Sequence, residues 1–175
     1  MTGESDFNQL VESHYASLYR FAMSLARNEN DAGDLTQQTF YIWAAKGHQL
    51  QNPAKAKAWL FTTLHREFLE SHRRRVRFPH QNLATSEAEL PVIGPDLSQR
   101  LDAEAALRLL GLLDPTFQAP VALFYLEDYS YNQIAEILEI PLGTVKSRLS
   151  RGLAQLAGVI SQEPRSVPLK DQPYG

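Results

Sequence analysis

The sequence predicts an all-α fold of two small helical domains joined by a flexible linker. Apolar residues recur at spacings of three and four from Phe7 to Phe68 and again from Leu101 onward, which is the period of helices that bury one face. Residues 78–97, between these stretches, show no such period and contain three prolines. The chain of 175 residues is 43% hydrophobic, which is enough for packed cores and argues against disorder throughout.

Two helices are expected at the start of the first domain, residues 1–77. The first carries a periodic apolar face from Phe7 to Leu25 and ends at the polar break of residues 27–30. Asp31 then has the side chain of a helix cap, and acidic residues favour the first turn of a helix because of its dipole. We expect this second helix to run to about Lys46.

A third helix is expected to begin near Ala54. Leu60, Leu64 and Phe68 lie four apart on one face of it, and the arginine-rich run of residues 73–77 is expected to be its irregular exit. The flexible linker of residues 78–97 follows.

The second domain is predicted to span residues 98–162, with residues 163–175 as a disordered tail. Its most informative part begins at Ser130, which forms a capping box with Gln133 and starts a short helix. Pro141 cannot continue that helix but suits the first turn of another one. Two short helices around a tight turn are typical of a helix-turn-helix.

The second helix of this pair has one apolar and one basic face. Val145 and Leu149 face inward, and no acidic residue lies in residues 140–162. An ordinary helical hairpin is the alternative, but the coincidence of motif and charge favours binding of duplex DNA in the major groove. The candidate DNA contacts are Thr144, Lys146, Ser147, Arg148, Ser150 and Arg151.

The net charge of −3 is unevenly distributed. Residues 51–80 hold seven basic and two acidic residues, a charge of +5, whereas residues 81–128 hold two and eight, a charge of −6. Positive charge follows phosphates and exposed aromatic rings stack on unpaired bases. Candidates for single-strand contact are Trp59, Phe61, His65, Arg66, Arg73, Arg74 and Arg75. The alternative is that Trp59 and Phe68 belong to the core and the arginines form a solvated helix end.

A third surface is expected on the second helix of the first domain, where Leu35, Thr39, Ile42 and Trp43 can pack inward. The outward face is acidic or amide-bearing, and a partner helix could dock on it. By the residues alone a plain solvated face is the safer interpretation. The candidate docking residues are Asp31, Asp34, Gln37, Gln38 and Tyr41.

Several functional classes are not expected. The chain has no cysteine, which excludes disulfides, thiolate zinc sites and cysteine nucleophiles. No metalloprotease, phosphate-loop or nucleophile-elbow pattern occurs, so we expect no enzyme, no metal, no cofactor and no small-molecule substrate. Neither a signal peptide nor a membrane span is evident, which predicts a soluble cytoplasmic protein.

Taken in order, these segments resemble a bacterial RNA polymerase sigma factor of the sigma-70 family, extracytoplasmic-function group, over about residues 7–160. The matches are Asp31-Ala32-x-Asp34-Leu35-x-Gln37-x-x-Phe40, Ala58-Trp59-Leu60-Phe61-Thr62, Ile134-Ala135-Glu136-Ile137-Leu138 and Pro141 to Leu149. The resemblance implies that residues 1–77 are sigma domain 2, which docks on the clamp helices of polymerase β′ and melts the minus-ten element. It implies that residues 98–162 are sigma domain 4, which reads the minus-thirty-five element. An anti-sigma factor is a further candidate partner.

Three departures from the group's usual pattern involve four residues. His65 and Arg66 stand where an Arg-Asn pair is usual, and Gln38 replaces a usual glutamate. Glu139 stands where a glycine usually makes the turn, and a left-handed backbone there would cost on the order of 1–2 kcal/mol. The competing function is a helix-turn-helix transcriptional regulator that is not a polymerase subunit, although residues 1–77 look like neither a receiver nor a ligand-sensing domain.

Overall fold

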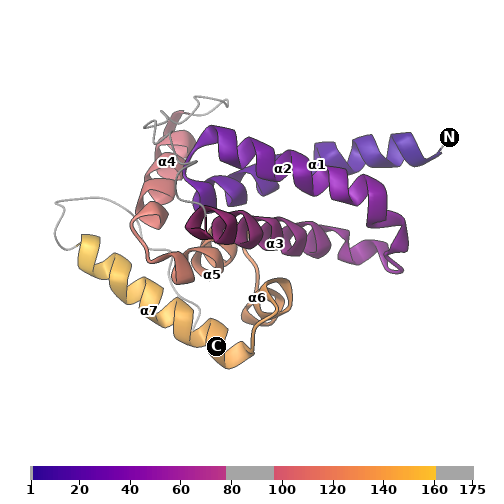
Figure 1. Cartoon of the computed structure of the whole chain (residues 1–175). Coiled ribbons are helices and arrows are strands. Elements are labelled where there is room, and N and C mark those ends of the chain that lie inside the picture. The colour runs from indigo at the N-terminus through magenta and orange to yellow at the C-terminus, as the bar shows by residue number, and fades with distance from the viewer. Residues whose placement is uncertain (1, 78–96, 161–175) are drawn as a thin grey trace.

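Helices alone make up the regular secondary structure of residues 2–77 and 97–160, the parts of the chain that the computed structural model describes (Figure 1). This confirms the predicted all-α class. The predicted linker and tail fall almost wholly outside these ranges. The elements in chain order are α1 (Thr2–Ala26), α2 (Glu29–Lys46), the 3₁₀ turns η1 (Gly47–Gln49) and η2 (Pro53–Lys55), α3 (Ala56–Arg77), α4 (Leu97–Gly111), α5 (Pro115–Tyr125), α6 (Tyr131–Leu138) and α7 (Leu142–Ile160).

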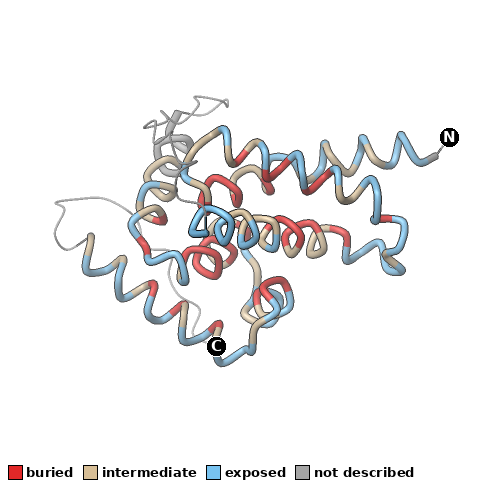
Figure 2. The backbone as a smooth tube through the Cα atoms, viewed as in Figure 1, coloured by how far each residue is buried: buried red, intermediate tan, exposed pale blue. Residues whose placement is uncertain are grey.

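The first lobe is the bundle of α1, α2 and α3, whose apolar faces meet. Leu18, Phe21, Leu60 and Leu64 are fully buried between them, and the buried stretches face the inside of the bundle in Figure 2. Because these side chains recur every three or four residues, each helix presents one continuous apolar stripe to its neighbours.

The cap of α2 differs from the expectation. Asn28, in extended conformation, caps the helix: its side-chain oxygen accepts a hydrogen bond from the Asp31 backbone N–H at 2.8 Å. The prediction that Asp31 is the cap was wrong, because Asp31 lies three residues later, in the first turn. Its carboxylate instead accepts a hydrogen bond from the Asn28 side-chain amide at 2.8 Å. The predicted end at Lys46 is confirmed.

The basic end of α3 also differs from the expectation. Residues 73–77 remain helical, whereas the sequence predicted an irregular exit. Arginine is a good helix former, positive charge is favourable near a helix C-terminus, and Arg74 pairs with Glu70 one turn earlier at 3.5 Å. The start of α3 is Ala56 instead of Ala54, after the short 3₁₀ turn η2 that Asn52 caps.

The second lobe contains the predicted helix-turn-helix, formed by α6 and α7 on α5. The capping box is confirmed: the Gln133 backbone N–H donates to Ser130 Oγ at 3.2 Å, and the Ser130 backbone N–H donates to Gln133 Oε1 at 2.9 Å. Val145 and Leu149 face inward as predicted. Glu139 ends α6 in the left-handed conformation, with φ 57° and ψ 43°.

The two lobes pack against each other, a contact that the sequence analysis did not anticipate. Helix α1 contacts α4 and α5, and α3 contacts α6, so that one cluster of buried apolar residues runs through both lobes. In Figure 1 the second lobe lies along one side of α3. We call this the closed arrangement. None of the helices in the described ranges has the length and apolar character needed to span a bilayer.

Replacing Gly152 with alanine is expected to lower the free energy of unfolding by about 1–3 kcal/mol, because it overpacks the contact between α5 and α7. A Cβ atom there would lie 2.8 Å from Val121 Cγ2 and 3.2 Å from Phe117 Cβ. The matched control is Gly158→Ala on the same helix, where a Cβ would meet nothing within 4 Å, and alanine should stabilise by about 0.5–1 kcal/mol. Urea denaturation compares them, and equal stability of the two variants would contradict this account of the packing.

Candidate nucleic-acid interface

One face of α7 is free to meet a ligand. Lys146, Ser147, Ser150 and Arg151 are exposed, as the sequence predicted, on the side opposite to the buried apolar stripe. The other two candidates for duplex contact, Thr144 and Arg148, are half-buried. This surface offers cationic and hydroxyl groups on a helix narrow enough for a major groove.

The aromatic candidates of α3 are covered in the closed arrangement. Phe61 has no exposed surface, and its ring packs against Phe21 at 5.3 Å and Tyr129 at 5.5 Å between centroids. Trp59 is half-buried and meets Trp43 edge-on at 5.1 Å. The expectation of exposed rings therefore does not hold for Phe61 in this arrangement, because the α5–α6 turn and the bundle core enclose it. The alternative placed Trp59 and Phe68 in the core, and both are only partly buried, packed against it.

The two residues that follow, His65 and Arg66, face the second lobe. Arg66 forms a two-pronged ion pair with Glu139, with both N–O distances 2.7 Å. Burial, followed by the positive charge of Arg148, lowers the pKa of His65 to about 4, although Glu139 acts in the opposite direction. Arg148 therefore acts electrostatically on α3, in addition to lying on the predicted DNA-reading helix.

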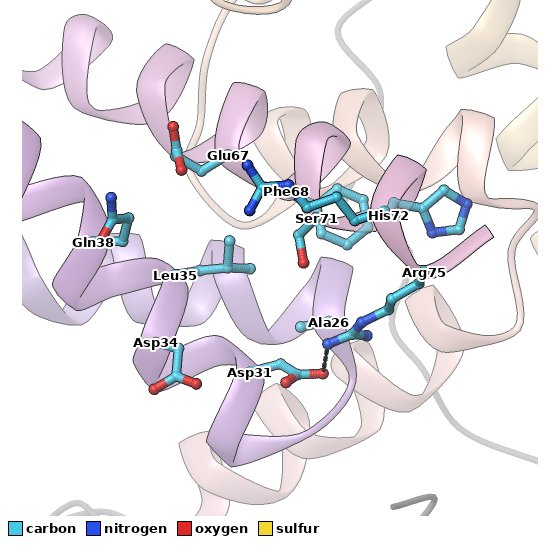
Figure 3. Close-up of a pocket in the computed structure, with 11 residues that line it drawn as sticks. Ala26, Asp31, Asp34, Leu35, Gln38, Glu67, Phe68, Ser71, His72 and Arg75 are labelled. Carbon is cyan, nitrogen blue, oxygen red and sulfur yellow. Dashed lines mark hydrogen bonds and ion pairs between the residues drawn. The ribbon is translucent and has the colours of Figure 1, made fainter. Parts of the chain in front are cut away.

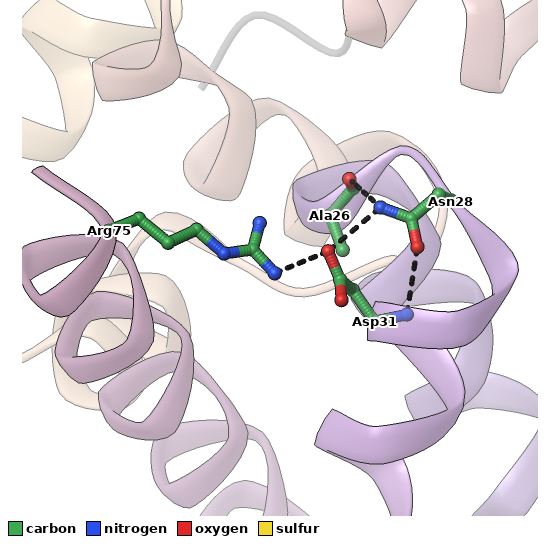
Figure 4. Close-up of polar contacts among 4 residues, drawn as sticks. All are labelled: Ala26, Asn28, Asp31 and Arg75. Atoms are coloured by element: carbon green, nitrogen blue, oxygen red, sulfur yellow. Dashed lines mark hydrogen bonds and ion pairs between the residues drawn. The ribbon is translucent and has the colours of Figure 1, made fainter. Parts of the chain in front are cut away.

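The arginines at the end of α3 do not form one free patch. Arg73, Arg74 and Arg75 are all exposed, but Arg74 pairs with Glu70 and Arg75 pairs with Asp31. Arg75 reaches across to the first turn of α2 (Figure 4). The structure thus joins a candidate DNA contact to a candidate docking residue.

This pair affects the ionisation of Asp31. Burial raises the pKa of its carboxyl, but hydrogen bonds from Asn28 and Arg75 together with the Arg75 charge outweigh it and hold the pKa below its ordinary value. Asp31 therefore stays ionised at neutral pH and fastens the end of α3 to the start of α2.

A groove of about 490 Å³ lies between α2 and α3 (Figure 3). Asp34 and Gln38 line it from α2, Glu67 lines it from α3, and Leu35 and Phe68 supply apolar surface. The other two docking candidates, Gln37 and Tyr41, are exposed but do not line the groove, and the Tyr41 side chain is 72% exposed. The outward face predicted on α2 is therefore open. The groove beside it carries charges of both signs, since Arg74 and Arg75 line it together with the acidic residues.

Sequence reasoning missed Glu127, the buried acid of the lobe interface. Its side chain is 2% exposed, and its two oxygens accept hydrogen bonds from Arg20 at 2.8 and 3.1 Å. Burial raises the pKa of Glu127, and the hydrogen bonds and charge of Arg20 offset this only in part. No local pattern marks this pair, since 107 residues separate its members.

Two further contacts tie the lobes together. The Thr62 hydroxyl donates to the Ile137 carbonyl at 2.9 Å, and Lys55 pairs with Glu136 at 3.2 Å. Among the described residues, no group of three or more histidine, aspartate or glutamate side chains could hold a metal ion.

Comparisons with known proteins find similarity in both lobes. Family models match two parts of the chain: Sigma-70 region 2 matches residues 10–78, and Sigma-70 region 4 matches residues 103–156. The chain is 35% identical over 161 residues to the ECF RNA polymerase sigma factor SigE of Mycolicibacterium smegmatis, covering 89% of this chain and 62% of that relative. It is 32% identical over 143 residues to SigL of Mycobacterium tuberculosis, covering 80% of each chain.

Solved structures are similar over nearly the whole chain. The sigma factor RpoE from Bartonella quintana, in complex with the anti-sigma factor NepR, superposes with a TM-score of 0.73 at 30% identity. The match covers 91% of this chain and 99% of that one. CnrH, in complex with the cytosolic domain of CnrY, has the same fold, with a TM-score of 0.65 at 23% identity.

Replacing His65 with glutamine is expected to flatten the loss of stability in acid. The folded chain holds His65 neutral down to about pH 4, whereas an unfolded histidine gains a proton near pH 6.5. Stability should therefore fall as the pH drops from about 6.5 to about 4, by up to about 3 kcal/mol from this group. Urea denaturation at several pH values measures the slope. Identical slopes for the variant and the wild-type chain would show that His65 is not the group responsible.

Proposed function

The chain belongs to the extracytoplasmic-function group of the sigma-70 family of RNA polymerase sigma factors. On this premise we propose which surface of the chain carries out each step of transcription initiation. Residues 1–77 act as sigma domain 2 and residues 98–162 as sigma domain 4. The chain directs core polymerase to promoters from the cytoplasm and catalyses no step itself. A regulator that acts without polymerase is not favoured, because both family regions are present.

Reading of the minus-thirty-five duplex is assigned to α7. The observation that carries this assignment is its exposed face of Lys146, Ser147, Ser150 and Arg151, backed by a buried apolar stripe within a helix-turn-helix. Arginine and lysine can pair with guanine edges, and hydroxyls suit bases or phosphates. Thr144 and Arg148 join this surface once α7 no longer faces α3.

Docking on the β′ clamp helices is assigned to α2 and its groove. Asp34, Gln37, Gln38 and Tyr41 offer one carboxylate, two amides and one phenol on an open face. Such a face suits a partner helix that carries positive charge and hydrogen-bond donors. Asp31 contributes indirectly, because its ion pair with Arg75 fixes the angle between α2 and α3.

Capture of the opened minus-ten strand is assigned to α3, with Trp59, Phe61, His65 and Arg66 around the bases and Arg73, Arg74 and Arg75 near phosphates. Extruding a base costs a few kcal/mol, which stacking and pocket contacts offset. This role requires the second lobe to leave α3, since that lobe covers Phe61 and pairs with Arg66.

Promoter geometry gives a reason for polymerase to separate the lobes. Two elements about two duplex turns apart are roughly 68 Å apart along the axis, at ~34 Å per turn. A relaxed linker of 20 residues, 78–97, spans only about 25 Å, although it can stretch to about 70 Å. Lobes in contact therefore cannot reach both elements, and core polymerase holds them apart.

An anti-sigma factor is proposed as a second partner. The similar RpoE structure contains the anti-sigma factor NepR, which supports this proposal for the present chain. Such a partner would act by holding the chain away from core polymerase.

The free chain is expected to bind promoter DNA poorly, and the chain with core polymerase is expected to bind it specifically. Mobility-shift and run-off transcription assays over a promoter library, with and without core enzyme, measure this. Tight specific binding by the chain alone would contradict the need for polymerase. Failure to start RNA synthesis at any promoter with core enzyme present would refute the proposed function.

Lys146→Ala and Arg151→Ala are each expected to reduce promoter-specific initiation by about five- to a hundredfold, because a good contact to a base contributes about 1–3 kcal/mol. Arg108→Ala serves as the matched control, since it removes an exposed positive charge from α4 of the same lobe and should change little. Run-off transcription with each holoenzyme compares the three variants. An equal loss in all three would indicate general charge attraction instead of reading by α7.

A further inference from the structure

We propose that Arg77 joins Arg73 as a phosphate contact at the end of α3, and that Arg75 instead positions this end of the helix against α2. The inference rests on the proposed function, which assigns α3 to capture of the opened minus-ten strand. It adds Arg77 to the residues assigned to that strand and removes Arg75 from them.

The helical backbone decides which of these arginines share a face. Residues 73–77 continue α3 to its end, so successive side chains are about 100° apart around the helix axis. Arg73 and Arg77 are four residues apart and are therefore neighbours on one face. Arg75 is two residues from each and lies on the opposite side of the helix. A strand that follows Arg73 and Arg77 therefore runs along the side of α3 that faces away from Arg75.

The side of α3 that carries Arg75 faces the bundle. Leu64 is fully buried on this side. Phe68, Ser71 and Arg75 follow at spacings of three or four residues, and all three line the groove between α2 and α3. Arg75 reaches across to pair with Asp31 in the first turn of α2 (Figure 4). Its guanidinium thus joins two helices of the first lobe, which is the role of a positioning residue.

The charge of the groove also disfavours a phosphate at Arg75. Three carboxylates line this groove, those of Asp31, Asp34 and Glu67. Asp31 stays ionised at neutral pH, since its pKa lies below the ordinary value. A phosphate in the groove would meet this negative charge inside the screening length of about 10 Å at 0.1 M salt. Phosphates are therefore expected on the other side of the helix.

Arg74 takes an intermediate direction. It lines the groove and pairs with Glu70 at 3.5 Å. Glu70 lies three residues before Arg73, close enough to share its face. The pair with Arg74 holds this carboxylate on the side of Arg74 and so keeps negative charge away from Arg73.

The opposite face of α3 offers free positive charge. Arg73 and Arg77 are exposed, neither lines the groove, and neither forms an ion pair with another residue of the described ranges. Arg66, which is assigned to the bases, lies seven residues before Arg73, about two turns away on this same face. A strand that leaves Arg66 along the helix therefore meets Arg73 and then Arg77. Each guanidinium group can grip a phosphate with two hydrogen bonds.

The test measures the salt dependence of promoter binding by the holoenzyme, the full chain with core polymerase. The probe is a fluorescent fragment of a promoter found by run-off transcription, left unpaired over its minus-ten element. Arg73→Gln and Arg77→Gln should each reduce the slope of log affinity against log salt by about 0.7, the value of one phosphate contact on a single strand. Between about 50 and 200 mM salt, each variant should therefore lose about two- to threefold less affinity than the wild-type chain. Arg108→Gln on α4 removes an exposed charge as the control and should leave the slope unchanged.

Arg75→Gln should leave the slope as in the wild-type chain but lower the urea midpoint of the free chain, because it breaks the contact between α3 and α2. Asp31→Asn should lower that midpoint as well. The double variant should lose no more stability than the larger single loss, since either substitution already breaks the pair. Glutamine is nearly as good a helix former as arginine, so a change in helix propensity does not account for such a loss.

An unchanged slope for Arg77→Gln, or an equal reduction for Arg75→Gln, would overturn this division of the arginines. Losses of stability that add in the double variant would refute the positioning role of Arg75. If Arg75→Gln does not fold, the slopes of Arg73→Gln and Arg77→Gln decide. Run-off transcription separates these failures from failure of the proposed function. Initiation by the wild-type holoenzyme leaves the sigma function standing whatever the slopes, and absence of initiation at every promoter refutes it.

Discussion

The closed arrangement depends on a carboxylate that is buried by two lobes at once. Glu127 lies in the turn between α5 and α6, yet the groups that compensate its charge, Arg20 and Lys57, come from α1 and α3. Taking an ion pair out of water costs several kcal/mol per ion and is repaid only with good geometry. Removing one partner therefore costs more than the pair contributes. Glu127 is either paired with Arg20 when the lobes are in contact or hydrated when they are apart. Partly separated lobes are unfavourable, because they would leave the carboxylate neither paired nor hydrated.

The interface between the lobes combines polar contacts with buried apolar packing. Around Glu127 lie two exposed ion pairs, one hydroxyl-to-carbonyl hydrogen bond and the ring of Tyr129. The exposed ion pairs can be hydrated again at little cost, whereas the apolar side chains that the two lobes bury together cannot. The junction lies against the helix to which strand capture is assigned.

Most of the fold and part of the candidate site could be predicted from the sequence. The Ser130 capping box, the inward Val145 and Leu149 and the exposed face of α2 are consequences of short-range spacing. Two of the errors were also local: Asn28 replaced Asp31 as the cap of α2, and the arginines at the end of α3 stayed helical. In both cases the free energies of the two alternatives differ by only about 1 kcal/mol. The residue pattern alone does not resolve so small a difference.

By itself, the sequence determined the helices, the helix-turn-helix and the faces that carry charge, because these depend on residues three or four apart. Only the tertiary structure decided which charges meet. Arg66 faces Glu139 across 73 residues and Arg20 faces Glu127 across 107, while Phe61 is buried by a tyrosine of the other lobe. The physical reason is that a given charge or aromatic ring would gain a similar, small contact energy from many possible partners distant in the sequence. The packing of α5 and α6 on the first lobe selects among them.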